Sequence, residues 1–251
     1  PNIDHNTHLF YVYSSLNYGK PVFVDLEDHF PISIFSGTSH CAAINDEGSI
    51  LFISKTMLEK NETVPQLFKL PNNEKATCIA CCNDFLFATS ENGRLYSCPK
   101  VENSFTEFVM VVGIQCSRFI QVSGISNHCL ALTSEGKVYG YGSDNQNQLG
   151  IHHKKLKEFN KLAELEKLNS FEISQVSAGD FRSVFVTKDG QAIACGLANF
   201  GELFINTKTT FDFDIIIKTD CKYCFTGCGI SYAFMNCDPP IHNPNCPISY
   251  K

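Results

Sequence analysis

Short apolar runs separated by glycine-ended turns recur along the chain. An apolar stretch of four to six residues enters a turn of acidic residues, Asn or Asp that ends in glycine, and a second apolar stretch leaves it. Glycine takes a positive φ at little cost, so this pattern predicts a β-hairpin. The turn glycines are Gly48, Gly93, Gly136 and Gly190, and they are 45, 43 and 54 residues apart.

The repeated pattern extends upstream of the turns. A glycine precedes three of the four hairpins, namely Gly37, Gly124 and Gly179, and an extended stretch leads into it. Each repeat offers three or four short strands and no regular helix. A repeat of this length with four strands has the size of a propeller blade.

The chain therefore predicts an all-β fold, a single β-propeller domain over residues 1–251 with about five repeats. The predicted repeats span about 21–65, 66–108, 109–160 and 161–210. Half repeats occupy 1–20 and 211–236, and a tail rich in cysteine and proline occupies 237–251. The first half repeat matches the back of a repeat and the second matches the front. Such halves either complete one blade of a small closed propeller or mark the ends of a partial one.

The most specific stretch runs from His128 to Gly150, with the sequence His-Cys-Leu-Ala-Leu-Thr-Ser-Glu-Gly-Lys-Val-Tyr-Gly-Tyr-Gly-Ser-Asp-Asn-Gln-Asn-Gln-Leu-Gly. It resembles the regulator of chromosome condensation repeat, in its entry with His, its acidic-Gly turn, its Val-Tyr, its aromatic-Gly pair and its Gln-Leu-Gly end. Residues 196–203 are similar to the last part of that repeat, and residues 37–40 to the first. Under this resemblance Gly142 and Gly196 are structural repeat positions, like the glycines upstream of the turns.

The resemblance implies a diverged family member. Ile53-Ser54 and Cys98-Pro99 stand where the aromatic-Gly pair is expected, and the chain has no Trp. The family's best-known fold has seven blades, more than the repeats counted here. The first residue is Pro rather than Met. We therefore expect a part of a larger propeller, present as a fragment or a processed chain.

His40 and His128 occupy the same place in their repeats, which raises the question of a metal or catalytic site. Phe85 and Arg182 stand at that place in the other two repeats. A shared metal site would not tolerate these replacements, whereas positions fixed by a repeat usually serve packing. We therefore predict a structural role for both histidines.

The thirteen cysteines are odd in number, and many lie in apolar runs. This usage favours small core side chains in a reducing compartment, the cytoplasm or the nucleus, over a disulfide framework. Cys221 and Cys224 have the spacing of zinc ligands, and Cys237 and Cys246 follow in the tail. The alternative to core cysteines is a zinc site formed by these four residues.

The third glycine spacing is long because of an insertion over residues 151–171. Leu156, Phe159, Leu162 and Leu165 recur every three residues, with Lys and Glu between them, which predicts one short amphipathic helix. Its apolar face either forms a lid on the blade edge or docks a partner. The lid is favoured because so short a helix needs packing to persist.

Charge and motifs narrow the function. With 20 Lys and Arg against 26 Asp and Glu, the chain lacks the basic surplus of a nucleic-acid-binding protein. No apolar run approaches the length of a membrane helix. Motifs of common enzymes are missing, so we predict no catalytic residue and no cofactor. The predicted function is a protein–protein interaction platform. The alternative, implied by the resemblance, is guanine-nucleotide exchange on a small GTPase.

Overall fold

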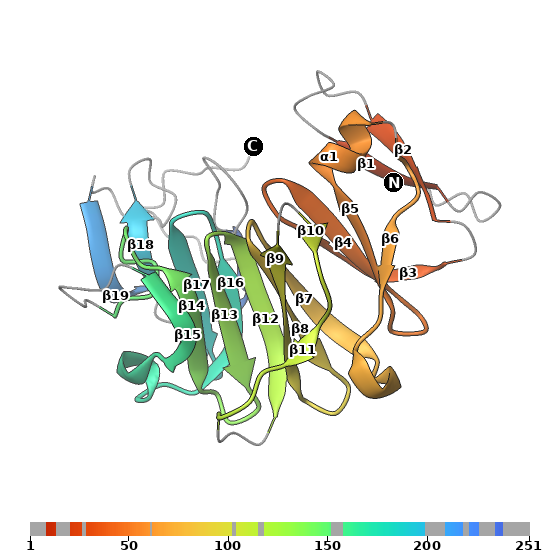
Figure 1. The fold of residues 1–251 in the computed structure, drawn as a ribbon. Helices are drawn as coiled ribbons and strands as arrows, with labels where there is room; N and C mark the ends of the chain where they lie inside the picture. The colour runs from red at the N-terminus through yellow and green to blue at the C-terminus, as the bar shows by residue number, and fades with distance from the viewer. Residues whose placement is uncertain are drawn as a thin grey trace. The chain divides into compact units, whose positions relative to one another are not determined.

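The computed structural model describes residues 9–13, 21–26, 29–60, 62–101, 104–114, 118–151, 158–198, 209–217, 221–225 and 234–237. The chain divides into two compact parts, Pro1–Ile114 and Gln115–Lys251, called the N-terminal unit and the C-terminal unit. Antiparallel strands build both of them (Figure 1). The predicted all-β class is confirmed.

The N-terminal unit contains one two-stranded sheet and two larger ones. Its strands are β1 (Leu9–Tyr13), β2 (Pro21–Asp25), β3 (Pro31–Ser36), β4 (His40–Asn45), β5 (Ile50–Ser54), β6 (Gln66–Phe68), β7 (Ala76–Cys82), β8 (Phe85–Ser90), β9 (Leu95–Val101), β10 (Ser104–Phe105) and β11 (Val109–Met110). Strands β1 and β2 pair with each other, and β3 to β6 form the first sheet in chain order. Strands β7, β8 and β9 form the second sheet, and both β10 and β11 pair with β9.

The C-terminal unit repeats the same meander twice. Its strands are β12 (Phe119–Ser126), β13 (His128–Thr133), β14 (Val138–Ser143), β15 (Glu158–Glu164), β16 (Ile173–Ala178), β17 (Arg182–Thr187), β18 (Ala192–Ala198), β19 (Thr209–Ile217), β20 (Cys221–Phe225) and β21 (Phe234–Cys237). Strands β12 to β15 form the third sheet and β16 to β19 the fourth. Strands β20 and β21 form a separate antiparallel pair.

Two backbone hydrogen bonds recur in all four larger sheets. In the first, the N–H groups of Asp46, Glu91, Ser134 and Lys188 in the turns donate to the carbonyls of Phe30, Lys75, Arg118 and Glu172, ahead of the first strands. In the second, the N–H groups of Lys55, Lys100, Ser143 and Leu197 donate to the carbonyls of Ser39, Asp84, Asn127 and Phe181. Donor and acceptor are sixteen residues apart in every one of these bonds. The repeat seen in the sequence is therefore a repeat of backbone geometry.

A β-bulge marks the start of each of the four larger sheets. The pairing of the first two strands shifts register between Pro31 and Ser33 in the first sheet, and at the equivalent place in the other three. The pair β20–β21 shifts in the same way, between Cys221 and Tyr223. This pair therefore has the form of the two inner strands of a fifth sheet.

Each unit has its own core between facing sheets. In the N-terminal unit, Ile44 and Ile50 of the first sheet and Leu86 and Tyr96 of the second belong to one buried cluster. In the C-terminal unit, Leu130 of the third sheet and Phe185 of the fourth belong to one buried cluster. Burying one such side chain contributes roughly 1.5–3 kcal/mol, so the sheets depend on each other for stability.

The helix predicted for residues 151–171 is wrong. Residues 158–164 form β15, which pairs Ala163 with Gly140 of β14, and a 3-10 turn (η3, Glu166–Leu168) follows. Along β15 the backbone groups bond to the edge of β14, whereas a short helix has no such support. Leu165 is 2% exposed in the core of the C-terminal unit, so it is not available to a partner. Leu162 is partly buried, while Leu156 and the side chain of Phe159 lie outside the described residues.

A helix of five residues, α1 (Lys55–Glu59), was not predicted. It follows β5, where the family pattern expects the aromatic-Gly pair, and the side chain of Ser54 accepts a hydrogen bond from the Met57 N–H at 3.2 Å. A 3-10 turn (η2, Pro71–Asn73) precedes the second sheet. The diverged residues Ile53-Ser54 thus end a strand and begin a helix.

Candidate functional site

The four turn glycines share one conformation. Gly48, Gly93, Gly136 and Gly190 have φ values of 80°, 75°, 82° and 85°. A buried polar side chain three residues before the glycine supports each turn. It accepts a hydrogen bond from the backbone N–H of the residue that follows the glycine. These side chains are Asn45, Ser90, Thr133 and Thr187, with distances of 2.8, 3.2, 3.2 and 2.8 Å. Sequence reasoning missed them, although a polar residue three positions before each glycine was visible.

The other repeat glycines permit close approaches of the backbone. A Cβ on Gly142 would lie 2.2 Å from the Asn127 carbonyl oxygen, and one on Gly196 would lie 2.3 Å from that of Phe181. Gly37 is as crowded, against the carbonyl of Cys81. Gly179 donates its N–H to the Arg182 carbonyl at 2.8 Å. Gly124 lies within β12, opposite Cys129.

His40 is packed among aromatic rings in the N-terminal unit. Its ring centroid lies 5.1 Å from that of Phe52 and 5.3 Å from that of Phe105, and its Nδ1 is 3.1 Å from the Ser39 hydroxyl. Burial, with a smaller contribution from the charge of Lys100, lowers its pKa to about 4. The ring is therefore neutral at physiological pH.

His128 forms a serine–histidine contact that does not have the arrangement of a catalytic pair. Its Nε2 lies 3.0 Å from the Ser183 hydroxyl, and burial lowers its pKa to about 4. Ser183 donates its own proton to the Gln148 carbonyl at 2.7 Å, so the histidine donates to the serine rather than accepting from it. A nucleophilic serine needs the reverse direction. Both side chains are 0% exposed, which leaves no path for a substrate.

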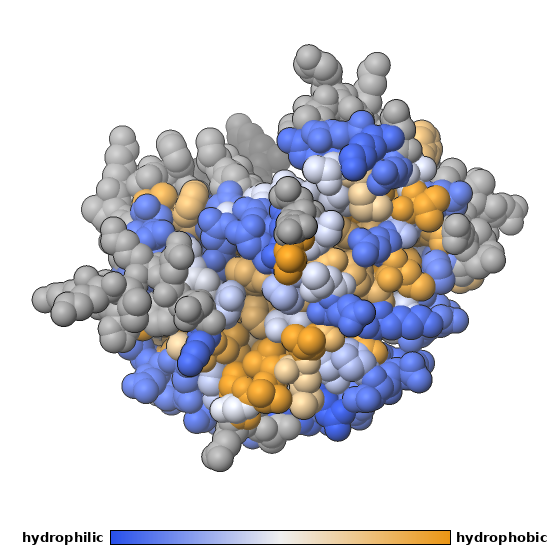
Figure 2. Space-filling view, in the orientation of Figure 1, coloured by the Kyte–Doolittle hydropathy of each residue, from blue (hydrophilic) through white to orange (hydrophobic). Residues whose placement is uncertain are grey.

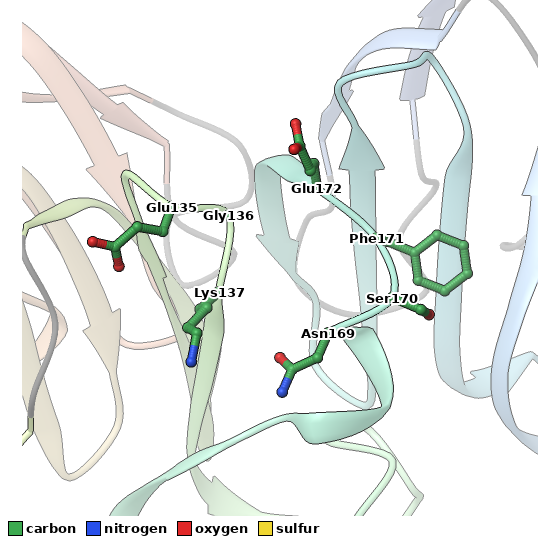
Figure 3. Close-up of a pocket in the computed structure, with 7 residues that line it drawn as sticks. All are labelled: Glu135, Gly136, Lys137, Asn169, Ser170, Phe171 and Glu172. Carbon is green, nitrogen blue, oxygen red and sulfur yellow. The ribbon is translucent and has the colours of Figure 1, made fainter.

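A shallow pocket of about 240 Å³ lies between the turn of the third sheet and the start of the fourth (Figure 3). Its lining residues are Glu135, Gly136, Lys137, Asn169, Ser170, Phe171 and Glu172. Lys137 and Asn169 donate to Glu164 Oε1, at 3.1 and 3.0 Å, and Glu172 pairs with Lys188. Lys137 and Asn169 thus connect the turn regions to β15, whereas Glu172 and Lys188 form an exposed ion pair.

The zinc alternative falls largely outside the described residues. Cys221 lies opposite Cys237 in the pairing of β20 with β21, and Cys224 lies opposite Met235. The side chains of these three cysteines, and all of Cys246, are not among the described parts. Within those parts, no three side chains that bind metals come together. The zinc site stays a prediction.

The seven described cysteines whose side chains are placed form no disulfide bond. Five of them are buried, namely Cys81, Cys82, Cys98, Cys129 and Cys195, and two are partly buried. Cys81 and Cys98 belong to the core of the N-terminal unit, and Cys195 belongs to that of the C-terminal unit. No helix within the described ranges is long and apolar enough to cross a bilayer.

Large apolar side chains lie exposed on the last strand of the second sheet and in the two residues after it. Val109, Met110 and Val112, called the β11 patch, are 55%, 47% and 75% exposed. Figure 2 shows an apolar area where Figure 1 places β11. Single exposed apolar residues are common on proteins, but a run of them along an edge strand favours contact with another chain.

Comparison with known proteins finds matches to repeats of one family. The model of the regulator of chromosome condensation (RCC1) repeat matches residues 119–148 and 173–202. The E3 ubiquitin-protein ligase HERC2 of Homo sapiens is 33% identical over 84 residues, which are 34% of this chain and 2% of that protein. The secretion-regulating guanine nucleotide exchange factor of Bos taurus is 29% identical over 83 residues, which are 33% of this chain and 18% of that protein.

A solved structure extends the similarity to most of the chain. The yeast RCC1 protein Prp20, solved bound to Kap60, matches with a TM-score of 0.70 at 15% identity. The match covers 86% of this chain and 57% of that structure. At this identity the match establishes the fold alone. The chain thus spans a small part of these two relatives and somewhat more than half of the solved protein.

Proposed function

We propose that this chain, a diverged β-propeller built from regulator of chromosome condensation repeats, serves as a protein-interaction platform. The observation that carries the proposal is the β11 patch, a set of exposed uncharged side chains on the edge strand β11 and just after it. Strand β11 pairs with β9 through Val109 and Met110, and no pairing on its other edge is found in the described part of the N-terminal unit. Such an edge binds an extended apolar segment of a partner through backbone hydrogen bonds and side-chain contacts.

The solved relative supports a binding role in general terms. Prp20 was crystallised with a second protein, Kap60, bound to it. The geometry of His128 and Ser183 also favours binding over chemistry, because that contact is closed to solvent. The described cysteines form no disulfide, which is compatible with a reducing compartment, and we propose the cytoplasm or the nucleus as the location.

Replacing Val112 with Asp is expected to abolish binding of a partner that uses the β11 patch, because a carboxylate would have to be desolvated in an apolar contact. The measurement is affinity purification with quantitative mass spectrometry. The matched control is Leu67→Asp, which places the same charge at an exposed apolar position of the first sheet. A partner retained by the control and lost by Val112→Asp supports the proposal. The proposal would be contradicted if the unmodified chain, Val112→Asp and Leu67→Asp all bound the same set of partners.

A second candidate function is guanine-nucleotide exchange on a small GTPase, favoured by the similarity to the bovine exchange factor. A nucleotide-release assay with a panel of small GTPases tests it. Exchange activity predicts accelerated release at catalytic amounts of this chain, whereas a pure binding platform leaves the release rate unchanged.

A further inference from the structure

Three of the four larger sheets end in an outer strand whose sequence discourages pairing with another chain. Among the described strands, β6, β11, β15 and β19 each pair on one side only. Strand β6 lies between Pro65 and Lys69, β15 contains Lys161, and β19 contains Asp212 and Asp214. Charged residues and prolines at an edge hinder the addition of a further strand. The edges of β6, β15 and β19 are therefore protected.

Strand β11 lacks this protection. Residues 108–114 contain no Lys, Arg, Asp, Glu or Pro, and Val109, Met110 and Val112 are exposed. The space beside the end of the strand is open, because nothing lies within 4 Å of a Cβ built on Gly113. An unprotected edge in a fold that protects its other three outer strands is expected where pairing with another chain is favourable.

The backbone of β11 shows which residues an incoming strand would meet. The Val111 N–H donates to the Leu95 carbonyl at 2.8 Å, so the backbone groups of Val111 are directed towards β9. Successive residues of a strand direct their backbone groups to opposite edges, so Met110 and Val112 direct theirs away from β9. The side chains of Met110 and Val112 point to the same side of the sheet. An incoming strand therefore meets the backbone groups and the apolar side chains of these two residues together.

We propose that the outer edge of β11 pairs with the same edge of a second copy of this chain and forms a symmetric dimer. This inference rests on the proposed function, for which β11 is the binding surface, and names its partner. The two strands run antiparallel about a two-fold axis at Val111. Met110 of each copy then lies opposite Val112 of the other, and the two residues exchange both of their backbone hydrogen bonds.

Charge and order favour a second copy as the occupant. The chain has a net charge of −6, so two copies repel each other, but pairing within residues 108–114 places no charged residues opposite one another. Strand β11 is already extended and held by β9, whereas a disordered segment would lose conformational freedom on binding. The pairing also removes two unprotected edges at once. Two short strands bury less area than a standard interface, so we expect a dimer that dissociates on dilution.

The experiment is sedimentation velocity of the full chain at concentrations from about 1 µM to about 300 µM, a range suited to a weak contact. We expect the mass to rise with concentration from that of one chain, 28.0 kDa, towards twice that value. Val112→Asp is expected to raise the dissociation constant about tenfold or more, because its carboxylate would be desolvated against Met110 of the other copy. The matched control is Leu67→Asp, the same change at an exposed apolar position of the outer strand β6, which should leave the dissociation constant unchanged.

A double variant tests the two-fold pairing. Met110→Lys alone should weaken the dimer as Val112→Asp does, so the result does not depend on the folding of one variant. With both changes in one chain, an ammonium group lies opposite a carboxylate at both residue pairs of the dimer. We therefore expect the double variant to dimerise again, and added salt to weaken its dimer. If the double variant stays monomeric, β11 does not pair with β11 in this register and the proposal is wrong.

The other outcomes separate the dimer from the proposed function. Unfolding in urea, followed by circular dichroism, shows whether each variant is folded. The dimer is overturned if the chain is monomeric at every concentration, if Val112→Asp leaves the mass unchanged, or if Leu67→Asp abolishes dimerisation as well. A monomeric chain that still loses a different protein through Val112→Asp in affinity purification keeps β11 as a binding surface and excludes only the second copy. A chain that shows neither dimerisation nor such a partner overturns both proposals.

Discussion

Replacing Gly142 with alanine is expected to destabilise the C-terminal unit by about 3–5 kcal/mol, a large part of the stability of a typical domain. Gly142 has a φ of 95°, and a Cβ there would lie 2.2 Å from the Asn127 carbonyl oxygen. That oxygen cannot withdraw easily, because it accepts the hydrogen bond from the Ser143 N–H that recurs in every larger sheet. The measurement is urea unfolding followed by circular dichroism.

Gly113 separates backbone strain from crowding. Its φ is 87°, but nothing lies within 4 Å of a Cβ built on it. Gly113→Ala should therefore cost only about 1–2 kcal/mol, the strain of a positive φ. Equal losses in the two variants would show that the approach to Asn127 is unimportant.

The protein should lose stability as pH falls from 6.5 towards 4. His40 and His128 have pKa values of about 4 in the folded chain, below the ordinary value of 6.5, chiefly because burial disfavours the charged ring. As pH falls, the unfolded chain takes up protons before the folded chain does. The folded chain therefore keeps its full stability above pH 6.5 with respect to these two histidines, and it loses stability as the pH falls below that value. At pH 5 the loss is about 2 kcal/mol for each histidine, relative to pH 7.

A neutral replacement tests the assignment. His128→Gln keeps a polar group near the Ser183 hydroxyl but cannot be protonated. The free energy of unfolding is measured in urea at pH 7 and at pH 5. The loss of stability between pH 7 and pH 5 should be about 2 kcal/mol smaller in this variant than in the unmodified chain. An unchanged difference would mean that His128 does not carry the pH dependence. His40→Gln provides the same comparison in the N-terminal unit.

The hairpins could be predicted because their signal is local. A glycine in a turn between two apolar runs needs only its neighbours to specify a positive φ, and all four turns have it. The sequence also predicted a structural role for His40 and His128, because a position fixed by a repeat rarely carries a catalytic residue. The buried partners of these rings, such as Ser183 for His128, come from other strands and leave no local pattern.

Residues 151–171 show why an apolar residue at every third position was not sufficient to predict a helix. Leu165 and Leu168 are buried as the prediction of a packed lid required, but the segment before them pairs with β14. The periodicity reports which side chains are apolar, whereas the free edge of a neighbouring strand decides the backbone conformation. The exposure of Pro31, Ile34 and Ser36 in β3 could not be predicted either, because these residues alternate with their neighbours much like the buried residues of β7 and β16.

The sixteen-residue hydrogen bonds described above divide the chain into fixed and adjustable lengths. Residues 30–55, 75–100, 118–143 and 172–197 are each spanned by one such pair of bonds, and the four segments are equally long. All variation in repeat length therefore lies between them, in residues 56–74, 101–117 and 144–171. An insertion inside a fixed segment would break a bond, whereas one between segments, outside the strands β6, β10, β11 and β15, leaves both bonds in place. The described connections between the fixed segments are thus the places to graft a foreign peptide or an affinity tag, and the hairpin turns are the places to avoid.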